Sequence, residues 1–427
     1  MNLNNMKILV VGGGGREHAI ISRLVKNPRI KKIFALPGNG GISELAECVK
    51  ISAENINGIV DFAKNNSIDF AVVAPDDPLA LGAVDALEAE NIPCFGPNKN
   101  AALIESSKIF AKNLMKKYNI PTAKYEIFDV LDEALTFAAK SDFPIVVKAD
   151  GLAKGKGVVV AENFEQAKNA IISCMKNKTF GSSGEKILIE ECLKGPEVTV
   201  LTFTDGKTII PMISSMDHKR ALDGNKGANT GGMGVIAPNN FYTPEIAYYC
   251  MEKIFKPTIE AMNNENRKFK GCLYFGLMLT KEGAKVIEYN CRFGDPETEA
   301  ILPLMETDLF EIMLAVSQEN LADIDIKFSN KASCCVIAAS RNYPASSPTG
   351  FEIDFGNADK IEGVEIFHAG TDVKTRDNDE KYFVTSGGRV LAVNAVAENL
   401  GLARSKAYEA INEIYFEGIK YRHDIGA

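Results

Sequence analysis

The sequence has 427 residues, of which 46% are hydrophobic and 24% are charged, and its formal net charge is -8. This length exceeds one ordinary hydrophobic core, so we expect roughly two to four globular domains. The acidic balance argues against a general nucleic-acid binder, although a local basic pocket for a phosphorylated metabolite stays open.

The cysteines and the start of the chain bear on its compartment. The nine cysteines are scattered, and the close pair Cys334 and Cys335 is adjacent rather than spaced like zinc ligands. We expect them to be buried small hydrophobes in a reducing compartment. Residues 1–7 lack the features of a signal peptide, and no run of about 18 apolar residues occurs. The expected location is the cytoplasm, without membrane contact.

A βαβ unit begins the chain. Lys7 to Val11 form an apolar run that leads into Gly12 to Gly15, and Arg16 to Lys26 have the apolar spacing of a helix. The backbone N–H groups of this turn offer a place for an anion. A dinucleotide fingerprint needs a third glycine, where this chain has Glu17 or His18. Support for an NAD-dependent oxidoreductase is therefore weak.

The α/β alternation continues, with a parallel sheet as the expected outcome. Further strands are expected at 32–35 and 70–74, and helices at 56–65, 79–90 and 99–118. Loops that carry Pro37 to Asn39 and Pro75 to Pro78 follow two of the strands. Because ligands bind beyond the carboxyl ends of parallel strands, these loops and the glycine turn should gather at one sheet edge.

A second glycine-rich loop lies in a new module. The strand Pro144 to Lys148 leads into Gly151 to Gly157, and a second strand, Val158 to Ala161, follows. Such a loop can lay its amides over phosphates, with Lys156 supplying charge. The glycine spacing is not that of a P-loop. A mobile surface hairpin with solubilising lysines is the alternative.

Two further stretches gather polar groups. Ile187 to Glu191 is an expected strand that ends in two acids, which can present a carboxylate to a ribose, although an ordinary edge strand looks similar. Asp217 to Arg220 precede Gly227 to Gly234, another glycine-rich loop. So many glycines suggest close approach of the backbone to a ligand.

Residues 273–290 carry the signal of a β-hairpin. Residues two apart on a strand point to the same side, so Glu288 and Asn290 should face one way and Ile287 and Tyr289 the other. A carboxylate and an amide oxygen side by side suit magnesium or manganese.

Arg292 follows this pair, where its rigid fork could hold a phosphate or carboxylate. The alternative is that Glu288 and Arg292 merely pair with each other at a polar strand rim. Beyond the hairpin, we expect strands at 334–339, 363–368 and 388–393, and helices at 308–319 and 403–416.

Five motifs in one order make the chain resemble the phosphoribosylamine–glycine ligases, or glycinamide ribonucleotide synthetases, of the ATP-grasp superfamily. The motifs are GGREH at 14–18, KADGLAKGKGV at 148–158, DHKR at 217–220, NTGGMG at 229–234 and EYNCRFGDPE at 288–297. The resemblance covers essentially the whole chain. It implies an α/β ATP-grasp fold with an N-terminal Rossmann-like domain and a C-terminal mixed α/β domain.

The resemblance also implies domain boundaries and site residues. The domains would be 1–106, an ATP-grasp core lobe of 107–122 and 195–330, a small lid lobe of 123–194, and 331–427. ATP phosphates would be bound by Lys108, Lys148, Gly151, Gly155, Lys156 and Gly157, and adenosine by Glu190, Glu191 and Glu197. The metal ligands would be Glu288 and Asn290. Catalytic roles fall to Lys148, Lys156, Asp217 and Arg292, and substrate binding to Gly14, Gly15, Asp76, Asp217, Arg292 and Asp295.

One position departs from the family pattern G-P-E-x-P-L. The chain reads Ala74 to Leu79 there as APDDPL, with Asp76 in place of Glu. Because Asp76 is one methylene shorter, a contact to substrate must be rebuilt or bridged by water.

The family joins glycine to 5-phosphoribosylamine with ATP and a magnesium or manganese ion, and we expect a monomer that takes these small molecules as partners. An acyl phosphate is the expected intermediate, because transfer to phosphate makes a carboxylate oxygen a good leaving group. The residue types suit positioning and charge neutralisation. The rivals are another ATP-grasp ligase, a nicotinamide-dependent oxidoreductase and a non-catalytic nucleotide-binding regulator.

Overall fold

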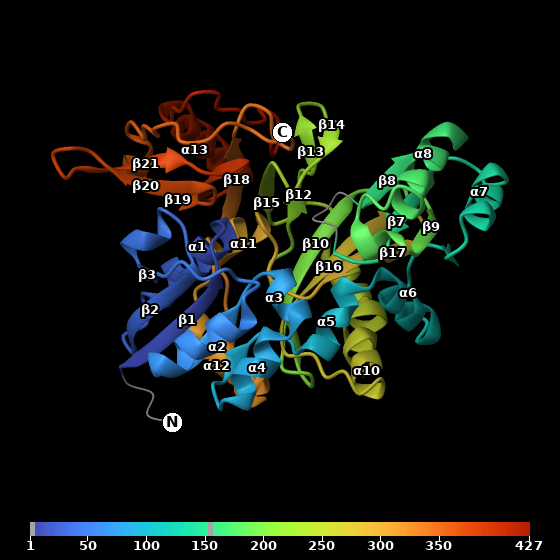
Figure 1. The fold of residues 1–427 in the computed structure, drawn as a ribbon, viewed down its shortest axis with the longest axis horizontal. Coiled ribbons are helices and arrows are strands. Elements are labelled where there is room, and N and C mark those ends of the chain that lie inside the picture. The colour runs from blue at the N-terminus through green and yellow to red at the C-terminus, as the bar shows by residue number, and fades with distance from the viewer. Residues whose placement is uncertain (1–4, 153–156) are drawn as a thin grey trace.

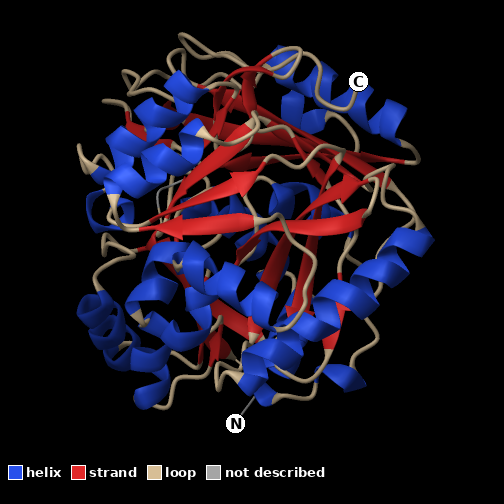
Figure 2. Cartoon of the chain, turned by 90° about the vertical axis from the view of Figure 1, so that its right-hand side faces the viewer, coloured by secondary structure: helices blue, strands red, loops and turns tan. Residues whose placement is uncertain are grey.

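The computed structural model describes residues 5–152 and 157–427. Four sheets of four or five strands each form its framework, with helices at the periphery and strands through the middle (Figures 1 and 2). The N-terminal unit lies at the lower left of Figure 1, a small lobe lies at the right, and the C-terminal unit lies at the upper left.

The N-terminal unit is a parallel sheet in the order β3-β2-β1-β4-β5. Its elements are β1 (Met6–Gly12), α1 (Gly15–Leu24), β2 (Ile30–Pro37), β3 (Glu47–Cys48), α2 (Ile56–Asn65), β4 (Phe70–Val73), α3 (Asp76–Leu81), α4 (Ala83–Ala89) and β5 (Cys94–Phe95). Successive β1 residues pack into two different cores, since Leu9 and Val11 join one and Ile8 and Val10 the other. This explains an unbroken apolar run, because both faces of the strand are covered.

Two of the helices expected from the sequence are each divided in two. The helix expected at 79–90 is broken at Gly82, which has φ +95° and separates α3 from α4. The helix expected at 99–118 is broken at Ser107, between α5 (Lys99–Ser106) and α6 (Lys108–Lys117). Ser107 has extended dihedrals, and its hydroxyl accepts a hydrogen bond from the Phe110 amide at 3.1 Å. It therefore caps a new helix rather than continuing the old one.

The small lobe is an antiparallel sheet in the order β6-β9-β7-β8, packed against two helices. Its elements are β6 (Tyr125–Phe128), α7 (Leu131–Ala139), β7 (Ile145–Ala149), β8 (Val158–Ala161), α8 (Phe164–Met175) and β9 (Ile187–Glu191). The lobe has a hydrophobic core of its own. Residues 153–156, part of the glycine-rich loop between β7 and β8, lie outside the described residues.

The central sheet has the order β11-β10-β16-β17. Its strands are β10 (Glu197–Thr204), β11 (Ile209–Pro211), β16 (Gly271–Thr280) and β17 (Gly283–Asn290), and the helices α9 (Pro244–Cys250), α10 (Lys256–Asn264), α11 (Glu297–Ile301) and α12 (Leu309–Gln318) complete this part. The expected hairpin of 273–290 is thus confirmed as β16 and β17. Its register shifts after the pair Gly276 and Glu288, because Leu277 pairs with Val286. Ile287 is therefore the extra residue of a β-bulge.

The C-terminal sheet has the order β12-β15-β18-β22-β19. Its strands are β12 (Met216–Asp217), β15 (Gly234–Ala237), β18 (Ala332–Ala339), β19 (Val364–His368) and β22 (Arg389–Ala397), with the hairpins β13 (Arg220–Leu222) and β14 (Lys226–Asn229), and β20 (Thr371–Thr375) and β21 (Lys381–Thr385), beside it. Two strands from within 195–330 therefore hydrogen-bond into the sheet of 331–427. The last helix, α13 (Leu400–Glu413), ends before Tyr415, which pairs with Asp354 instead.

Aromatic contacts join the N-terminal sheet to the central part of the molecule. The Phe95 ring lies 5.8 Å from Phe293 and 6.3 Å from Phe203, and the Phe70 ring lies 5.6 Å from Phe310. One continuous core therefore fixes the carboxyl edge of the N-terminal sheet against the end of β17.

Candidate active site

A cleft of about 1180 Å³ lies where the small lobe, the central sheet and both terminal units meet. Thirteen of the residues named from the sequence line it: Asp76, Lys108, Lys148, Gly151, Gly157, Glu190, Glu191, Glu197, Asp217, Glu288, Asn290, Arg292 and Asp295. Gly14 and Gly15 are not in its lining, and Gly155 and Lys156 lie outside the described residues. The cleft thus brings together side chains from residue 76 to residue 295.

The bulge in β17 shapes the floor of the cleft. Ala284, Val286 and Tyr289 belong to the hydrophobic core, whereas Glu288 and Asn290 line the cleft as the alternation predicts. Ile287 is not part of that core, and it lines the cleft together with Tyr289, so the cleft lining does not follow the two-residue alternation strictly. The reason is the extra residue, which interrupts the two-residue period of the strand.

The Glu288 carboxylate is ionised, and its cationic partner is Lys219 rather than Arg292. Lys219 Nζ donates to Glu288 Oε1 at 3.3 Å, and the Lys219 charge is the main cause that lowers the Glu288 pKa to about 2, against the opposing effect of burial. Arg292 pairs instead with Glu105 at 3.0 Å. Glu288 and Arg292 therefore do not form the ion pair that the alternative interpretation of the sequence expected.

The Glu288 and Asn290 oxygens fit a divalent metal. Both are hard-oxygen donors at one wall of the cleft, and each already accepts a hydrogen bond from a cation, in the case of Asn290 Oδ1 from Arg292 at 3.3 Å. Among residues 5–152 and 157–427, no group of three or more His, Cys, Asp and Glu side chains could hold a metal ion. Two protein donors suit a metal that takes its other ligands from phosphate and water.

Lysines gather beside this pair. Glu190 Oε2 forms ion pairs with Lys112 and Lys148 at 3.0 Å each, and Lys148 also donates to the Ile287 carbonyl at 3.1 Å. Burial lowers the Lys112 pKa to about 8. Glu190 Oε1 is buried and has no hydrogen-bond partner among the described residues. That oxygen is an acceptor available to a ligand, since buried polar atoms are normally paired.

Lys108, at the start of α6, links this helix to the small lobe. Lys108 Nζ donates to the Gly151 carbonyl at 2.7 Å, where the glycine-rich loop begins. Asp150 Oδ1 accepts from Ser107 Oγ at 3.1 Å and from the Ile109 amide at 3.0 Å. The break between α5 and α6 therefore holds the root of that loop.

Arginines and acids alternate at the other end of the cleft. Burial tends to raise the Asp76 pKa, but the charges of Arg292 and Arg16 overcome this, and the pKa is lowered. Glu105 has its pKa raised by burial, even though it accepts from the Cys291 amide at 2.7 Å. The Asp76 carboxylate therefore lies near the guanidinium groups of Arg292 and Arg16. This part of the cleft suits a ligand that carries both a positive and a negative group.

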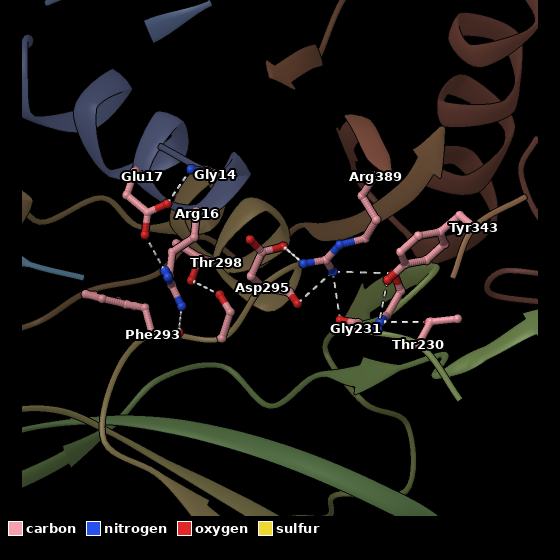
Figure 3. A network of polar contacts seen from close by, with 12 residues as sticks. Gly14, Arg16, Glu17, Thr230, Gly231, Phe293, Asp295, Thr298, Tyr343 and Arg389 are labelled. Atoms are coloured by element: carbon pink, nitrogen blue, oxygen red, sulfur yellow. Dashed lines mark hydrogen bonds and ion pairs between the residues drawn. The ribbon is translucent and has the colours of Figure 1, made fainter. Parts of the chain in front are cut away.

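Arg389 connects the C-terminal unit to this end of the cleft (Figure 3). Its guanidinium pairs with Asp295 Oδ1 at 2.8 Å and donates to the carbonyls of Asp295 at 2.9 Å and Gly231 at 2.7 Å. The Gly231 amide in turn donates to the Tyr343 hydroxyl at 3.0 Å. One arginine thus fixes both the Asp295 loop and the turn between β14 and β15. The loop expected at 227–234 is shorter in the structure, because residues 227–229 belong to β14 and Gly234 begins β15.

Asp217 is a partly buried acid in the cleft wall, and one of its carboxylate oxygens is unpaired in the part of the chain that the structure describes. Its Oδ1 is buried without a hydrogen-bond partner among the described residues, and burial and the Glu297 charge raise its pKa well above the usual range. A β-carbon on Gly232 would lie 2.6 Å from Asp217 Oδ1, so the glycine there permits the loop to close over the acid. Asp217 therefore holds a proton more tightly than an ordinary aspartate does.

The N-terminal glycine turn is tightly packed, and the amide of Gly14, the N-cap residue of α1, is already used. The Gly14 amide donates to Glu17 Oε2 at 2.6 Å, while Glu17 Oε1 pairs with Arg16 at 2.6 Å (Figure 3). A β-carbon on Gly13 would lie 2.4 Å from the Gly38 carbonyl oxygen. From this stretch, Arg16 is the residue that lines the cleft.

Sequence reasoning missed several residues of the cleft. Lys219 stands inside the DHKR motif, so its place beside the named Asp217 could have indicated it. Arg16 stands inside GGREH in the same way. Glu105, Lys112 and Arg389 belong to none of the five motifs, and only the tertiary fold brings them to the site.

Comparisons with known proteins agree with this geometry. Three family models match the chain: "Phosphoribosylglycinamide synthetase, N domain" at 6–105, "Phosphoribosylglycinamide synthetase, ATP-grasp (A) domain" at 106–298 and "Phosphoribosylglycinamide synthetase, C domain" at 333–427. The phosphoribosylamine–glycine ligase of Caldanaerobacter subterraneus subsp. tengcongensis is 47% identical over 422 residues, which cover 99% of this chain and 100% of that protein. The trifunctional purine biosynthetic protein adenosine-3 of Gallus gallus is 44% identical over 98% of this chain and 42% of that protein.

Solved structures show the same fold. The phosphoribosylamine–glycine ligase of Thermotoga maritima has a TM-score of 0.85 at 31% identity, covering 98% of this chain and 100% of that chain. The biotin carboxylase domain of Hydrogenobacter thermophilus 2-oxoglutarate carboxylase, solved with MgADP, has a TM-score of 0.74 at 17% identity over 97% of this chain and 91% of its own. The second similarity concerns the fold alone.

The fold and the cleft define an ATP-grasp enzyme, in which a small lobe and a central sheet enclose a nucleotide site. The chain belongs to the phosphoribosylglycinamide synthetase family, the ATP-binding ligases that supply glycinamide ribonucleotide in purine biosynthesis. The resemblance noted in the motifs is thereby confirmed, and the nicotinamide-dependent oxidoreductase is excluded. Within the described parts of the chain, none of the helices has both the length and the apolar character needed to cross a bilayer.

Proposed function

We propose that the cleft joins glycine to 5-phosphoribosylamine at the expense of ATP, giving glycinamide ribonucleotide, ADP and phosphate through glycyl phosphate. The observation that carries the proposal is the arrangement of one cavity with lysines and the Glu288 and Asn290 oxygens at one end and arginine–acid pairs at the other. A nucleotide triphosphate suits the first end, and a phosphorylated amine suits the second.

In the first step, a glycine carboxylate oxygen attacks the γ-phosphorus of ATP, and the bond to the ADP oxygen breaks. Lys108 and Lys148 neutralise the charge on the phosphates, and Lys156 with Gly151, Gly155 and Gly157 covers them. This step needs positioning and electrostatic stabilisation more than covalent participation of the protein. A magnesium or manganese ion, held by Glu288 and Asn290, would neutralise phosphate charge.

In the second step, the amine of phosphoribosylamine attacks the glycyl carbonyl carbon, the C–N bond forms, and phosphate leaves. Asp217 takes the proton that the amine loses, because burial and Glu297 make its carboxylate more basic than usual. Arg292, Asp295 and Asp76 position the phosphoribosyl group, with Gly14 and Gly15 at its phosphate. Water is kept away by the small lobe, which acts as a lid.

The remaining assignments complete the proposal. Glu190, Glu191 and Glu197 contact adenosine, since the first two end β9 at the cleft and the third begins β10. The enzyme acts as a monomer in the cytoplasm on small-molecule substrates. The domain boundaries implied by the resemblance stay a prediction.

Trapping of the intermediate tests this proposal. The enzyme is incubated with ATP, magnesium, glycine and hydroxylamine in place of phosphoribosylamine, and glycine hydroxamate and ADP are measured. We expect both products in equal amounts, and neither without glycine. With freshly generated phosphoribosylamine, ADP release should require glycine and amine together. Release of ADP from phosphoribosylamine without glycine would overturn the assignment.

A further inference from the structure

Lys219 lies against the pair of oxygens assigned to the metal. Its Nζ is 3.3 Å from Glu288 Oε1 and 3.6 Å from Glu197 Oε2, and its side chain is one-third exposed to the cleft. The residue follows β12, whose two residues pair with β15 of the C-terminal sheet. The Lys219 ammonium therefore reaches from the C-terminal sheet to an oxygen on the central sheet.

We propose that Lys219 occupies the cation position at Glu288 when nucleotide is absent, so that a free divalent ion binds only by displacing it. The inference rests on the proposed function, because it takes Glu288 and Asn290 as the metal ligands. Lys219 is a positioning residue in this scheme. Glu197 is the acid that keeps the ammonium close when it leaves Glu288.

The charges around Glu288 support this exclusion of a free ion. Lys148 Nζ donates to the carbonyl of Ile287, the residue before Glu288, at 3.1 Å, so two ammonium groups, those of Lys148 and Lys219, lie beside this carboxylate. Adding a divalent ion to them is unfavourable until more negative charge arrives. The phosphates of ATP supply that charge, so the metal enters as the nucleotide complex.

An ordinary structural ion pair is the alternative. In that case Lys219 only joins two sheets, and its removal would lower the stability of the protein without changing the affinity for a free metal ion. The two ideas differ in one measurable quantity, the dissociation constant for Mn²⁺ in the absence of nucleotide.

The experiment measures Mn²⁺ binding to the nucleotide-free protein by electron paramagnetic resonance and calorimetry. We expect Lys219→Met to bind Mn²⁺ at least tenfold more tightly than the parent chain, and Lys219→Arg, which keeps a cation, to bind as weakly as the parent. Lys219→Gln serves as a second neutral variant should the methionine variant fold poorly. Lys268→Met is the charge-matched control, because Lys268 pairs with Glu319 and is not in the cleft lining.

A double variant locates the gain. In Lys219→Met with Glu288→Gln, the tighter binding should disappear, because the freed carboxylate is gone. Equal Mn²⁺ affinity of the neutral Lys219 variants and the parent would overturn the inference, as would a gain that survives in the double variant. The hydroxamate assay on the parent chain is independent of this measurement, so a failure of the proposed function is told apart from a failure of the inference.

Discussion

At the scale of single residues, the site is a set of charges that are paired before any ligand binds. Glu288 is paired with Lys219, Arg292 with Glu105, and Asp295 with Arg389. Each pair is partly buried. Removing one member therefore leaves the other as a poorly solvated charge that has lost its ion-pair partner, which is unfavourable. Substitutions that keep shape and change charge are therefore the informative ones.

Glu288→Gln should lower turnover about a hundredfold, as expected when one preorganised electrostatic contact is removed. The amide keeps the shape of the side chain but lacks the charge that attracts a divalent ion. Turnover, a magnesium titration and the melting temperature are measured together. Glu282→Gln is the control, because Glu282 lies in the turn of the same hairpin with its side chain 78% exposed. Near-normal turnover with an unshifted magnesium requirement would contradict the metal assignment.

Gly14→Ala should raise the Michaelis constant for phosphoribosylamine several-fold and leave that for ATP nearly unchanged. The new β-carbon would lie 3.0 Å from Glu17 Oε2 and 3.3 Å from Asp295 Oδ2, so it presses on two acids near the proposed phosphoribosyl site. The described lysines assigned to ATP, Lys108 and Lys148, line the cleft, whereas Gly14 is not part of its lining. Steady-state kinetics with each substrate varied in turn checks this. A loss of ATP affinity would instead place the glycine turn at the nucleotide.

At the scale of elements, strands with strong apolar runs were predicted more reliably than helix ends and strand irregularities. The runs at β1 and β17 have strong apolar patterns, and both were found where expected. The break at Ser107 was missed, because the residues on either side of it are all compatible with one helix. The bulge at Ile287 was missed because it depends on the partner strand, β16, and not on local composition.

Ser107→Ala should destabilise the start of α6 by about 1 kcal/mol, the usual effect of losing a helix cap. It should also raise the Michaelis constant for ATP, because Ser107 Oγ holds Asp150 at the root of the glycine-rich loop. Denaturant unfolding and ATP kinetics are the measurements. Ser52→Ala is the control, since the Ser52 hydroxyl accepts from the exposed Glu54 amide at 3.3 Å, in a part of the chain that precedes α2 and lies outside α6. Unchanged ATP kinetics would mean that this contact does not hold the loop.

At the scale of the whole molecule, the C-terminal unit contributes side chains to the cleft and is not only a neighbour. Arg389 and Tyr343 line the cleft, and the first of these binds Asp295 and the Gly231 carbonyl. The sequence offered no signal for this role. Arg389 begins an ordinary strand, and its partners lie 94 and 158 residues away. Only the packing of the sheets creates the contact.

Arg389→Lys should raise the Michaelis constant for phosphoribosylamine about tenfold while the protein stays folded. A lysine keeps the charge but cannot form the planar fork that joins Asp295 to the glycine-rich loop. Kinetics and the melting temperature are compared with Arg376→Lys, a control in which an exposed arginine of the same unit pairs with Glu352. Equal Michaelis constants for the two variants would show that the fork is not needed.

The contact between the N-terminal and C-terminal units should also make stability depend on pH. His18 Nδ1 accepts a hydrogen bond from the His368 amide at 2.8 Å, and the two rings lie 5.5 Å apart. Burial lowers the pKa of His18 from 6.5 to about 4 and that of His368 to about 3. Both rings are therefore neutral in the folded protein at neutral pH.

The direction of the effect follows from proton binding. Between pH 6.5 and about 4, the unfolded chain binds a proton at His18 that the folded protein does not, so the free energy of unfolding falls as the pH falls. A pKa that drops from 6.5 to about 4 corresponds to about 3 kcal/mol, fully present above pH 6.5 and lost by about pH 4. Buried acids with raised pKa values, such as Glu299, act in the opposite direction over part of this range.

A difference measurement separates these contributions. In His18→Asn, the amide oxygen can accept from the His368 amide as Nδ1 does, but the side chain does not titrate. The unfolding free energies of the parent and this variant are compared in denaturant from pH 7.5 to pH 4. We expect the parent to lose about 3 kcal/mol more than the variant over this range. His423→Asn, at an exposed histidine beside Asp223, should follow the parent. Parallel curves for the parent and His18→Asn would show that the buried ring is not the source of the pH dependence.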